Sequence, residues 1–331
     1  MQQKTLTLIF RKRLPQFNSI EEVFIELLEQ LEKQIEVQNI EMPLAGADPF
    51  SVYRNVQYVK RNKTEVNHIT GHNNYAALSL GRSGILTIHD IGSAFYGNFL
   101  HKIYIKIFWF WLPALMIKKI TVISNFSKKE LSQLIPFAKN KIVVIHNPVN
   151  SSLQYRPKSF NVSNPLVLHI GTKSNKNIER TIEALEGISC RFLVIGELSL
   201  KQVELLEKHK IDYNNKKHIP FLEVKAAYEA CDLVSFVSLY EGFGMPVIEA
   251  QAVGRPVLSS AIEPIREVAG NSACLVNPKD VQDIRRGLLR IIEDNRYREE
   301  LIEMGQENIK RFQLKNIAAQ YLALYKEIAD V

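Results

Sequence analysis

Short apolar runs alternate along the chain with longer stretches in which apolar residues recur at helical spacing. Such short runs are typical of buried strands, and the longer stretches predict amphipathic helices. Strands that alternate with helices predict parallel sheets covered by helices, so the predicted fold class is α/β. The runs interpreted as strands span residues 6–10, 65–70, 84–90, 121–124, 142–145, 166–171, 192–195, 218–221, 233–237, 256–260 and 273–276.

The alternation continues through both halves of the chain, which at 331 residues is about twice the length of a usual single domain. We therefore expect two Rossmann-like parallel-sheet domains, at residues 1–150 and 165–312. Residues 151–164 are rich in Ser, Asn and Pro and lack periodicity, so they are interpreted as a linker. A carboxyl-terminal helix is expected over 313–331, where it can pack back on the first domain.

The stretch 240–250 follows an apolar run and leads into a helical pattern. Gly242 and Gly244 permit a backbone with no side chain in the way, and Pro246 has a φ that suits the first helical turn. A helix that begins here offers unpaired N–H groups and the positive end of its dipole. The stretch therefore predicts a phosphate-binding site.

Two carboxylates, Glu241 and Glu249, bracket this loop. Carboxylates beside a phosphate site indicate hydroxyl groups to be held, as on a sugar or a ribose. The alternative is a plain strand-to-helix turn in which Glu249 interacts only with the helix dipole.

Other polar groups follow apolar runs at places where parallel sheets bind ligands. His89 and Asp90 end one run, where a structural hydrogen bond is the alternative to a catalytic role. Arg11, Lys12 and Arg13 follow the first run and face either an anion or solvent. In the second half, lysines in the loop 172–177 are available to neutralise a diphosphate.

The segment 95–119 is unusually aromatic and carries lysines around its aromatic residues. One interpretation is an interfacial helix that dips into an anionic membrane. The other is a helix buried against the sheet, and the sequence leaves both open. No apolar run reaches the roughly 18 residues of a transmembrane helix, so no membrane span is expected.

The amino-acid composition limits the classes of molecule that this protein is expected to bind. The net charge of +7 permits an anionic partner such as a nucleotide or an anionic lipid, but no nucleic-acid-binding module is visible and no nucleic acid is expected. Three cysteines stand alone in apolar segments, without metal-ligand spacing, as in a reduced cytosolic protein. We therefore expect a cytoplasmic protein, at most peripheral on the inner face of the plasma membrane.

Several spaced motifs together resemble the retaining GT-B glycosyltransferases of group 1, also called glycosyltransferase family 4. Glu241 and Glu249, with seven residues between them, resemble the E-x7-E motif of that family. Segments 250–256, 263–270 and 277–278 extend the motif in the family's order. His89-Asp90 and the segments 124–127 and 146–148 resemble its amino-terminal landmarks.

The resemblance implies two domains that face a cleft, with the acceptor on the first and a nucleotide-diphosphate sugar, a UDP- or GDP-sugar, mainly on the second. Lys176 would stabilise the leaving phosphate, Glu241 the donor sugar and Glu249 the ribose, while His89 would face the reacting sugar. The remaining donor-binding residues would be Gly171, Thr172, Lys173, Gly242, Phe243, Gly244, Met245 and Pro246. The acceptor side would comprise Arg11, Lys12, Arg13, His89 and Asp90.

The sequence departs from the family at Thr172, where many members carry Arg. Lys173 would then supply the missing charge in a shortened loop. The first loop also lacks the glycine-rich turn that is common in the family.

Negative charge gathers on the departing diphosphate during glycosyl transfer, so preorganised positive charge at that phosphate is the largest help. The chain has no Asp-x-Asp motif, and we expect neither a metal nor another cofactor. Glu241 and Glu249 flank a phosphate loop and are interpreted as binding groups, which predicts front-face transfer with retention. The acceptor would be a sugar or a lipid-linked sugar in bacterial polysaccharide or glycolipid assembly. Alternatives are a GT-B-fold sugar-nucleotide epimerase and a binding protein without activity.

Overall fold

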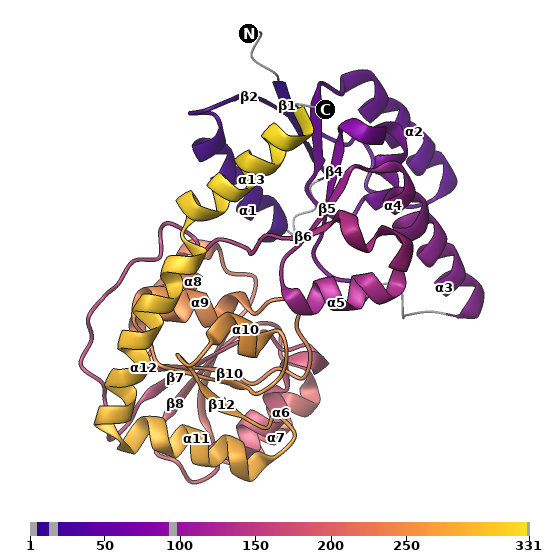
Figure 1. The fold of residues 1–331 in the computed structure, drawn as a ribbon. Helices are drawn as coiled ribbons and strands as arrows, with labels where there is room; N and C mark the ends of the chain where they lie inside the picture. Colours follow the sequence, from indigo (N-terminus) through magenta and orange to yellow (C-terminus); the bar gives the residue numbers. More distant parts are fainter. Residues whose placement is uncertain (1–4, 13–18, 93–97, 330–331) are drawn as a thin grey trace. The chain divides into compact units, whose positions relative to one another are not determined.

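A computed structural model describes residues 5–12, 19–92 and 98–329, and the chain divides into two compact units. The first comprises the residues up to Pro148 and from Leu314 onward, and the second spans Val149–Gln313 (Figure 1). Each unit is a parallel sheet with helices on both faces, which confirms the predicted fold class.

The first unit contains a six-stranded sheet in the order β2-β1-β3-β4-β5-β6. All its neighbouring strands are parallel, with Leu6 opposite Val66 where β1 pairs with β3. Its strands are β1 (Thr5–Phe10), β2 (Glu36–Glu41), β3 (Val66–Ile69), β4 (Gly84–Ile88), β5 (Lys119–Val122) and β6 (Ile142–Val144).

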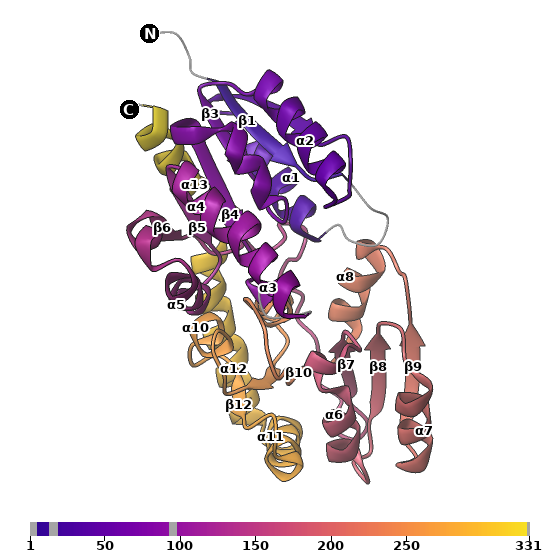
Figure 2. The same ribbon diagram turned by 90° about the vertical axis from the view of Figure 1, so that its right-hand side faces the viewer.

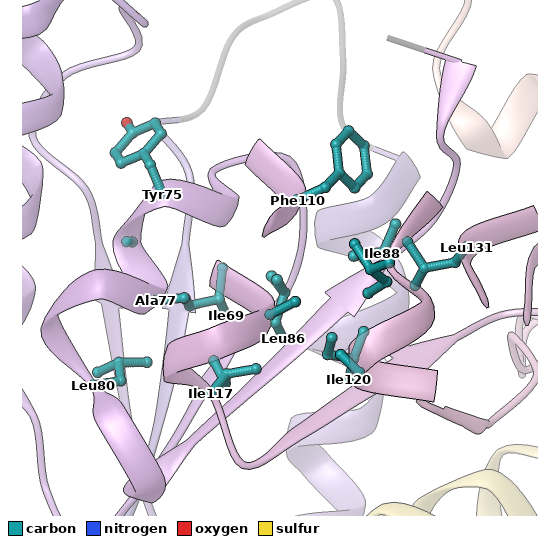
Figure 3. Close-up of a cluster of buried hydrophobic side chains, with 14 of the residues drawn as sticks. Ile69, Tyr75, Ala77, Leu80, Leu86, Ile88, Phe110, Ile117, Ile120 and Leu131 are labelled. Carbon is teal, nitrogen blue, oxygen red and sulfur yellow. The ribbon is translucent and has the colours of Figure 1, made fainter. Parts of the chain in front are cut away.

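Alternating side chains of these strands supply two cores, one on each face of the sheet. On one face, Figure 3 shows Ile69, Leu86 and Ile120 of the strands clustered with Phe110 and Leu131. The helical segments of this unit are α1 (Ser19–Leu31), α2 (Pro49–Asn62), η1 (Asn74–Ser79), η2 (Gly81–Ser83), α3 (Phe99–Ile105), the π-helix η4 (Lys106–Trp111), α4 (Leu112–Met116), α5 (Asn125–Leu134), η5 (Pro136–Lys141) and the returning helix α13 (Leu314–Ala329).

On the other face, α1 and α13 pack against Leu6, Leu8 and Phe10 of β1. A buried polar chain adds to this contact, since His68 Nδ1 lies 2.7 Å from the Tyr325 hydroxyl of α13 and its Nε2 lies 2.7 Å from the Thr87 hydroxyl. The chain's last helix is therefore part of the first unit's core.

The second unit has a six-stranded parallel sheet in the order β12-β11-β10-β7-β8-β9. In Figure 2 the arrows of β7, β8 and β9 lie side by side and point the same way. The strands are β7 (Leu166–Ile170), β8 (Arg191–Ile195), β9 (Asp212–Lys216), β10 (Leu233–Phe236), β11 (Val257–Ser260) and β12 (Cys274–Val276).

Helices cover both faces of this second sheet as well. α6, α7 and α11 contribute to a core on one face, and α8, α9 and α10 pack on the other (Figure 1). The helical segments are η6 (Ser174–Lys176), α6 (Ile178–Leu185), α7 (Leu200–Lys208), α8 (Phe221–Ala230), α9 (Met245–Val253), α10 (Ile265–Ala269), α11 (Val281–Glu293), α12 (Asn295–Asn308) and η7 (Ile309–Phe312).

Residues 151–164, expected as a linker, have neither helix nor strand and belong to the second unit. Within that unit Lys158 forms an ion pair with the buried Asp232. The Asp232 carboxylate also accepts a hydrogen bond from the Leu166 backbone at 2.7 Å, so the stretch is attached where β7 begins.

Two strands were not predicted from the sequence pattern, and one predicted strand is absent from the described residues. β2 and β9 are edge strands with polar sequences and many exposed or half-exposed residues. Because an edge strand pairs on one side only, it needs no continuous apolar run. The apolar signal at 218–221 instead marks the approach to α8.

Strand order then locates the ligand sites. In open α/β sheets, ligands bind outside the carboxyl ends of the strands, at the point where the strand order reverses. In the second unit this point lies between β7 and β10, and in the first between β1 and β3. The loops that follow these four strands are therefore the candidates.

Candidate functional site

The loops that follow β7 and β10 are hydrogen-bonded to each other. The Leu239 backbone N–H donates to the Asn175 carbonyl at 2.7 Å, and the Asn175 side-chain amide donates to the Tyr240 carbonyl at 3.1 Å. Behind them the buried Asn177 amide donates to the Val237 carbonyl at 3.0 Å. Segments about 60 residues apart in the chain thus form one surface.

Lys176 is the charged centre of this surface. Its Nζ lies 2.6 Å from Glu241 Oε1 and 4.8 Å from the centre of the Phe236 ring. Gly171 has a φ of +91°, and a Cβ there would lie 2.9 Å from Lys176 Cγ. The aliphatic stem of Lys176 therefore lies directly over Gly171. Any larger residue at position 171 would displace the Lys176 side chain.

The glycine-broken loop turns into α9 as its sequence predicts. Gly244 caps the helix with a φ of +107°, and a Cβ there would clash with Ile265 Cδ1. Pro246 lies in the first turn, where its missing N–H is not needed. The Phe243 ring is buried and packs edge-on against Phe312, so this side chain is a core residue and only its backbone can serve a ligand.

Glu249 lies one turn further along α9 and is half-buried. The hydroxyl of Tyr228, a fully buried residue of α8, donates to Glu249 Oε2 at 2.6 Å. Burial and the nearby Glu249 raise the pKa of Tyr228 well above its usual value, so the phenol stays protonated as a donor.

Thr172 and Lys173 lie where many members of the family carry an arginine, and their side chains differ in their contacts. The Thr172 hydroxyl donates to the Glu197 carbonyl at 2.6 Å, so this side chain fastens the loop toward the end of β8. Lys173 is exposed, and its side chain makes no hydrogen bond or ion pair within the described ranges. Met245 and Gly242 are half-exposed on the same surface.

In the first unit, His89 follows β4 and is almost fully buried. Its Nε2 lies 2.8 Å from the Thr70 carbonyl, and since a carbonyl can only accept, Nε2 carries the proton. Burial lowers the pKa of His89 to about 4. His89 is therefore neutral at pH 7, with Nδ1 as a hydrogen-bond acceptor.

A cavity of about 130 Å³ lies beside His89. His72 stacks on His89 with ring centres 6.3 Å apart, in a left-handed backbone conformation with a φ of +60°. The indole of Trp109 donates to the His72 carbonyl at 3.0 Å and so holds this unusual turn. The lining residues are His72, Asn74, Ile88, His89, Asp90, Trp109 and Phe110.

The basic residues that follow β1 are partly neutralised. Arg11 donates to the buried carboxylate of Glu21 through both Nε and Nη2, the latter at 3.1 Å. Lys12 lies 3.4 Å from Glu41 on the surface. Arg13 lies outside the described residues. Asp90 is exposed and accepts from the Gly92 backbone at 3.0 Å.

The aromatic segment 98–119 divides its side chains between core and solvent, while residues 95–97 are not described. Phe110 and Ile117 are buried in the first unit's core. Other large apolar residues of the segment are exposed, and together with the neighbouring Phe137 we call them the apolar face. They are Phe99, Leu100, Ile103, Phe108, Trp111, Leu115, Met116 and Phe137. No described helix is long and apolar enough to cross a membrane.

Four residues at these sites were missed from the sequence: Glu21, His72, Trp109 and Tyr228. His72 had a usable signal, because it follows an apolar run just as His89 does. The other three sit in helices, where nothing in the local pattern marks a side chain that reaches a distant loop.

Comparison with known proteins matches each unit of the chain to a family model. The family model described as Glycosyl transferases group 1 matches residues 153–308, and the one described as Glycosyltransferase Family 4 matches residues 21–153. The two matches meet close to the boundary between the units.

Among curated proteins, O-antigen chain mannosyltransferase B of Escherichia coli is 26% identical over 237 residues, which cover 63% of this chain and 60% of that protein. O-antigen chain mannosyltransferase RfbU of Salmonella typhimurium is 31% identical over 216 residues, covering 61% of this chain and 59% of the relative. The matched region thus spans about three fifths of the length of these relatives.

Among solved structures, HepE from Anabaena in complex with UDP and glucose superimposes with a TM-score of 0.76 at 16% identity. The match covers 98% of this chain and 100% of HepE. At this identity the likeness concerns the fold.

Proposed function

Because this chain belongs to the GT-B glycosyltransferases of group 1, we propose that it transfers a sugar from a nucleotide-diphosphate donor, a UDP- or GDP-sugar, to a hydroxyl acceptor. One observation carries the proposal. At the switch point of the second sheet, two loops bring together a lysine ammonium, two carboxylates and the start of α9. This set matches the charges and hydroxyls of a sugar nucleotide.

Each group has a chemical task in this proposal. Lys176 and the start of α9 hold the diphosphate, since positive charge and N–H donors stabilise phosphate oxygens. Glu241 accepts hydrogen bonds from the donor sugar, and Glu249 from the ribose hydroxyls. Lys173, exposed in the same loop, adds a positive charge toward the diphosphate.

Lys176 also explains how transfer can proceed without a metal. As the bond to the sugar breaks, negative charge grows on the departing diphosphate, and a fixed ammonium stabilises that charge. In the ligand-free chain this ammonium rests on Glu241. Binding of the donor therefore exchanges one anionic partner of Lys176 for another without moving a charge into an apolar region.

We propose that transfer retains the anomeric configuration. Glu241 lies beside Lys176 at the start of the loop that leads into α9, a place that suits hydrogen bonds to the donor sugar, so we assign it sugar binding and not nucleophilic attack. The departing phosphate then accepts the acceptor's proton on the same face of the sugar. His89, neutral and with an accepting Nδ1, binds a sugar hydroxyl in the small cavity of the first unit.

The acceptor we propose is a sugar, free or lipid-linked, in the assembly of a bacterial polysaccharide or glycolipid. This follows from relatives named as O-antigen chain mannosyltransferases. The epimerase alternative gains no support from the relatives reported above.

Binding of the donor is tested by a thermal-shift screen of UDP-, GDP- and ADP-sugars. A ligand present at about 100 times its Kd stabilises the folded chain by about 2.7 kcal/mol. One of the three should therefore raise the melting temperature, and Glu249→Ala should reduce that rise strongly. The matched control is Glu223→Ala, an exposed glutamate on α8 of the same unit.

An unchanged affinity for the donor in Glu249→Ala would contradict the central assignment. Incubation of the protein with the donor alone separates transfer from epimerisation. Formation of a new sugar nucleotide without any acceptor would establish an epimerase and reject the proposed transferase.

We further propose that the apolar face of the first unit docks on an anionic membrane. Phe99 and Leu100 are 76% and 75% exposed, an unfavourable state in water for two adjacent large apolar residues. Exposed lysines, Lys129 and Lys139, lie in the neighbouring segments α5 and η5. A lipid surface with negative headgroups suits this combination.

Vesicle co-sedimentation tests this docking. The protein should bind phosphatidylglycerol vesicles more strongly than phosphatidylcholine vesicles, and Phe99→Asp with Leu100→Asp should weaken binding roughly tenfold or more. Leu200→Asp with Leu222→Asp is the control, because these leucines are 83% and 74% exposed in the second unit. Equal loss in both double variants would reject the apolar face as the membrane contact.

A further inference from the structure

We infer that Tyr228 is a positioning residue that orients the Glu249 carboxylate for the ribose hydroxyls of the nucleotide, an inference that rests on the nucleotide-sugar binding proposed above. Tyr228 lies on α8, which the sequence motifs of the site do not include. The contact joins it to α9, 21 residues further along the chain.

The contact has the geometry of a strong hydrogen bond. The phenol oxygen lies 2.6 Å from Glu249 Oε2, within the range of about 2.5–2.7 Å that is found when a hydroxyl donates to an ionised carboxylate. Tyr228 is 0% exposed, so no water competes for its hydroxyl. Within the described ranges, Glu249 is the carboxylate to which this phenol donates.

The core determines where the donor lies. The backbone carbonyl of Tyr228 accepts from Arg255 Nε at 3.2 Å and from Cys231 Sγ at 3.3 Å. The buried Arg255 also donates to the Glu229 carbonyl at 2.7 Å. Because Arg255 directly follows the glycine that caps α9, it ties the end of α8 to the end of α9. The phenol is thereby held relative to the helix that carries Glu249.

Glu249 needs such a partner. It is a long side chain with several rotatable bonds on a half-buried position, and ordering it for a ligand costs conformational entropy. An ionised carboxylate accepts hydrogen bonds through both oxygens. With the phenol on Oε2, the carboxylate is already ordered as an acceptor for ribose hydroxyls, which donate.

The test compares ligands with and without the hydroxyls in question. Binding of UDP and GDP to the full chain is measured by calorimetry, and the better ligand is compared with its 2′,3′-dideoxy counterpart. Tyr228→Phe keeps the ring and removes the donor. We expect it to weaken the ribonucleotide roughly fivefold to tenfold and the dideoxynucleotide less than twofold.

A second cycle tests whether Tyr228 acts through Glu249. In a Glu249→Ala background, Tyr228→Phe should change ribonucleotide affinity less than twofold, because the group that it orients is gone. Tyr213→Phe, on β9 of the same unit, is the control for loss of a tyrosine hydroxyl elsewhere and should leave both ligands unaffected. Melting temperatures without ligand report on folding of each variant.

The outcomes separate this inference from the proposed function. If Glu249→Gln weakens the ribonucleotide selectively but Tyr228→Phe weakens both ligands equally or neither, the positioning role is overturned and nucleotide binding by Glu249 stands. If Glu249→Gln leaves ribonucleotide affinity unchanged, the proposed role of Glu249 fails, and the inference fails with it. Should Tyr228→Phe not fold, Arg255→Lys weakens the tie that holds the end of α8 while both groups of the Tyr228–Glu249 contact remain. A ribose-selective loss of affinity in that variant upholds the positioning role, and an equal loss for both ligands overturns it.

Discussion

Lys176 shows how much of this site depends on a single side chain. One ammonium touches a carboxylate and an aromatic ring, and its stem lies over a glycine. Gly171 is distant in sequence from the other two partners, and Phe236 and Glu241 are separated by the loop that follows β10. The neighbouring Lys173 has none of these contacts and is exposed. The two lysines therefore form a natural pair of variants.

Lys176→Met should reduce kcat by about 10²–10³, since loss of one group that stabilises the developing charge costs about 2.7–4 kcal/mol of barrier. Lys173→Met should reduce kcat far less, because an exposed lysine is not preorganised. Steady-state kinetics with a saturating donor measures both. Equal kcat values for the two variants would show that neither lysine is the preorganised charge.

At the scale of elements, the π-helix η4 between α3 and α4 decides where the aromatic residues point. Its wider turn places Phe110 in the core, leaves Phe108 and Trp111 exposed, and directs Trp109 to the His72 turn. Local π-helices occur frequently at functional sites. Here one short element serves the core, the apolar face and the cavity beside His89.

Trp109→Phe removes the indole donor to the His72 carbonyl but keeps an aromatic ring. We expect kcat/KM for the acceptor to fall about tenfold, while nucleotide affinity stays unchanged, because His72 lies in the first unit. Trp111→Phe is the matched control, since its indole donates to the Leu134 carbonyl at 3.0 Å. A drop in nucleotide affinity in Trp109→Phe would contradict a role confined to the acceptor side.

At the scale of the whole molecule, three buried histidines make the stability of the two units depend differently on pH below neutrality. Burial lowers the pKa of His68 to about 3, and the pKa values of His89 and His169 to about 4. His68 and His89 belong to the first unit, and His169 to the second. An unfolded histidine has a pKa near 6.5. As the pH falls below that value, the unfolded chain binds protons that the folded chain does not.

The free energy of unfolding should therefore fall as the pH drops from about 6.5 toward about 4, by up to about 1.4 kcal/mol per pH unit for each histidine. The first unit holds two of these histidines and also His72, whose pKa is lowered mainly by burial, so it should lose stability more steeply than the second. Both tryptophans, Trp109 and Trp111, lie in the first unit, so their fluorescence during urea unfolding reports on that unit.

The slope of stability with pH, measured in this way between about pH 7 and pH 5, should become smaller in His89→Gln. His169→Leu should leave the slope unchanged, because the tryptophans do not report on the second unit. A wild-type slope near zero would show that these histidines titrate normally in the folded chain.

The sequence by itself determined the features that depend on neighbouring residues. Apolar runs in alternation with helical spacing predicted parallel α/β architecture, and Gly242, Gly244 and Pro246 predicted a helix that begins directly after a glycine-broken loop. These features follow from local conformation and burial, which are written in residues a few positions apart. Polar edge strands such as β2 and β9 lack that signal and were missed.

Only the tertiary structure decided which distant residues meet. The Lys176–Glu241 pair spans 65 residues, and the pairing of Tyr228 with Glu249 and the stacking of His72 on His89 depend on how helices and loops are placed around each sheet. Strand order, which no periodicity encodes, brings the loops after β7 and β10 together. The physical reason is that a residue's pattern reports its own burial, whereas the identity of its partner is set by the packing of the entire unit.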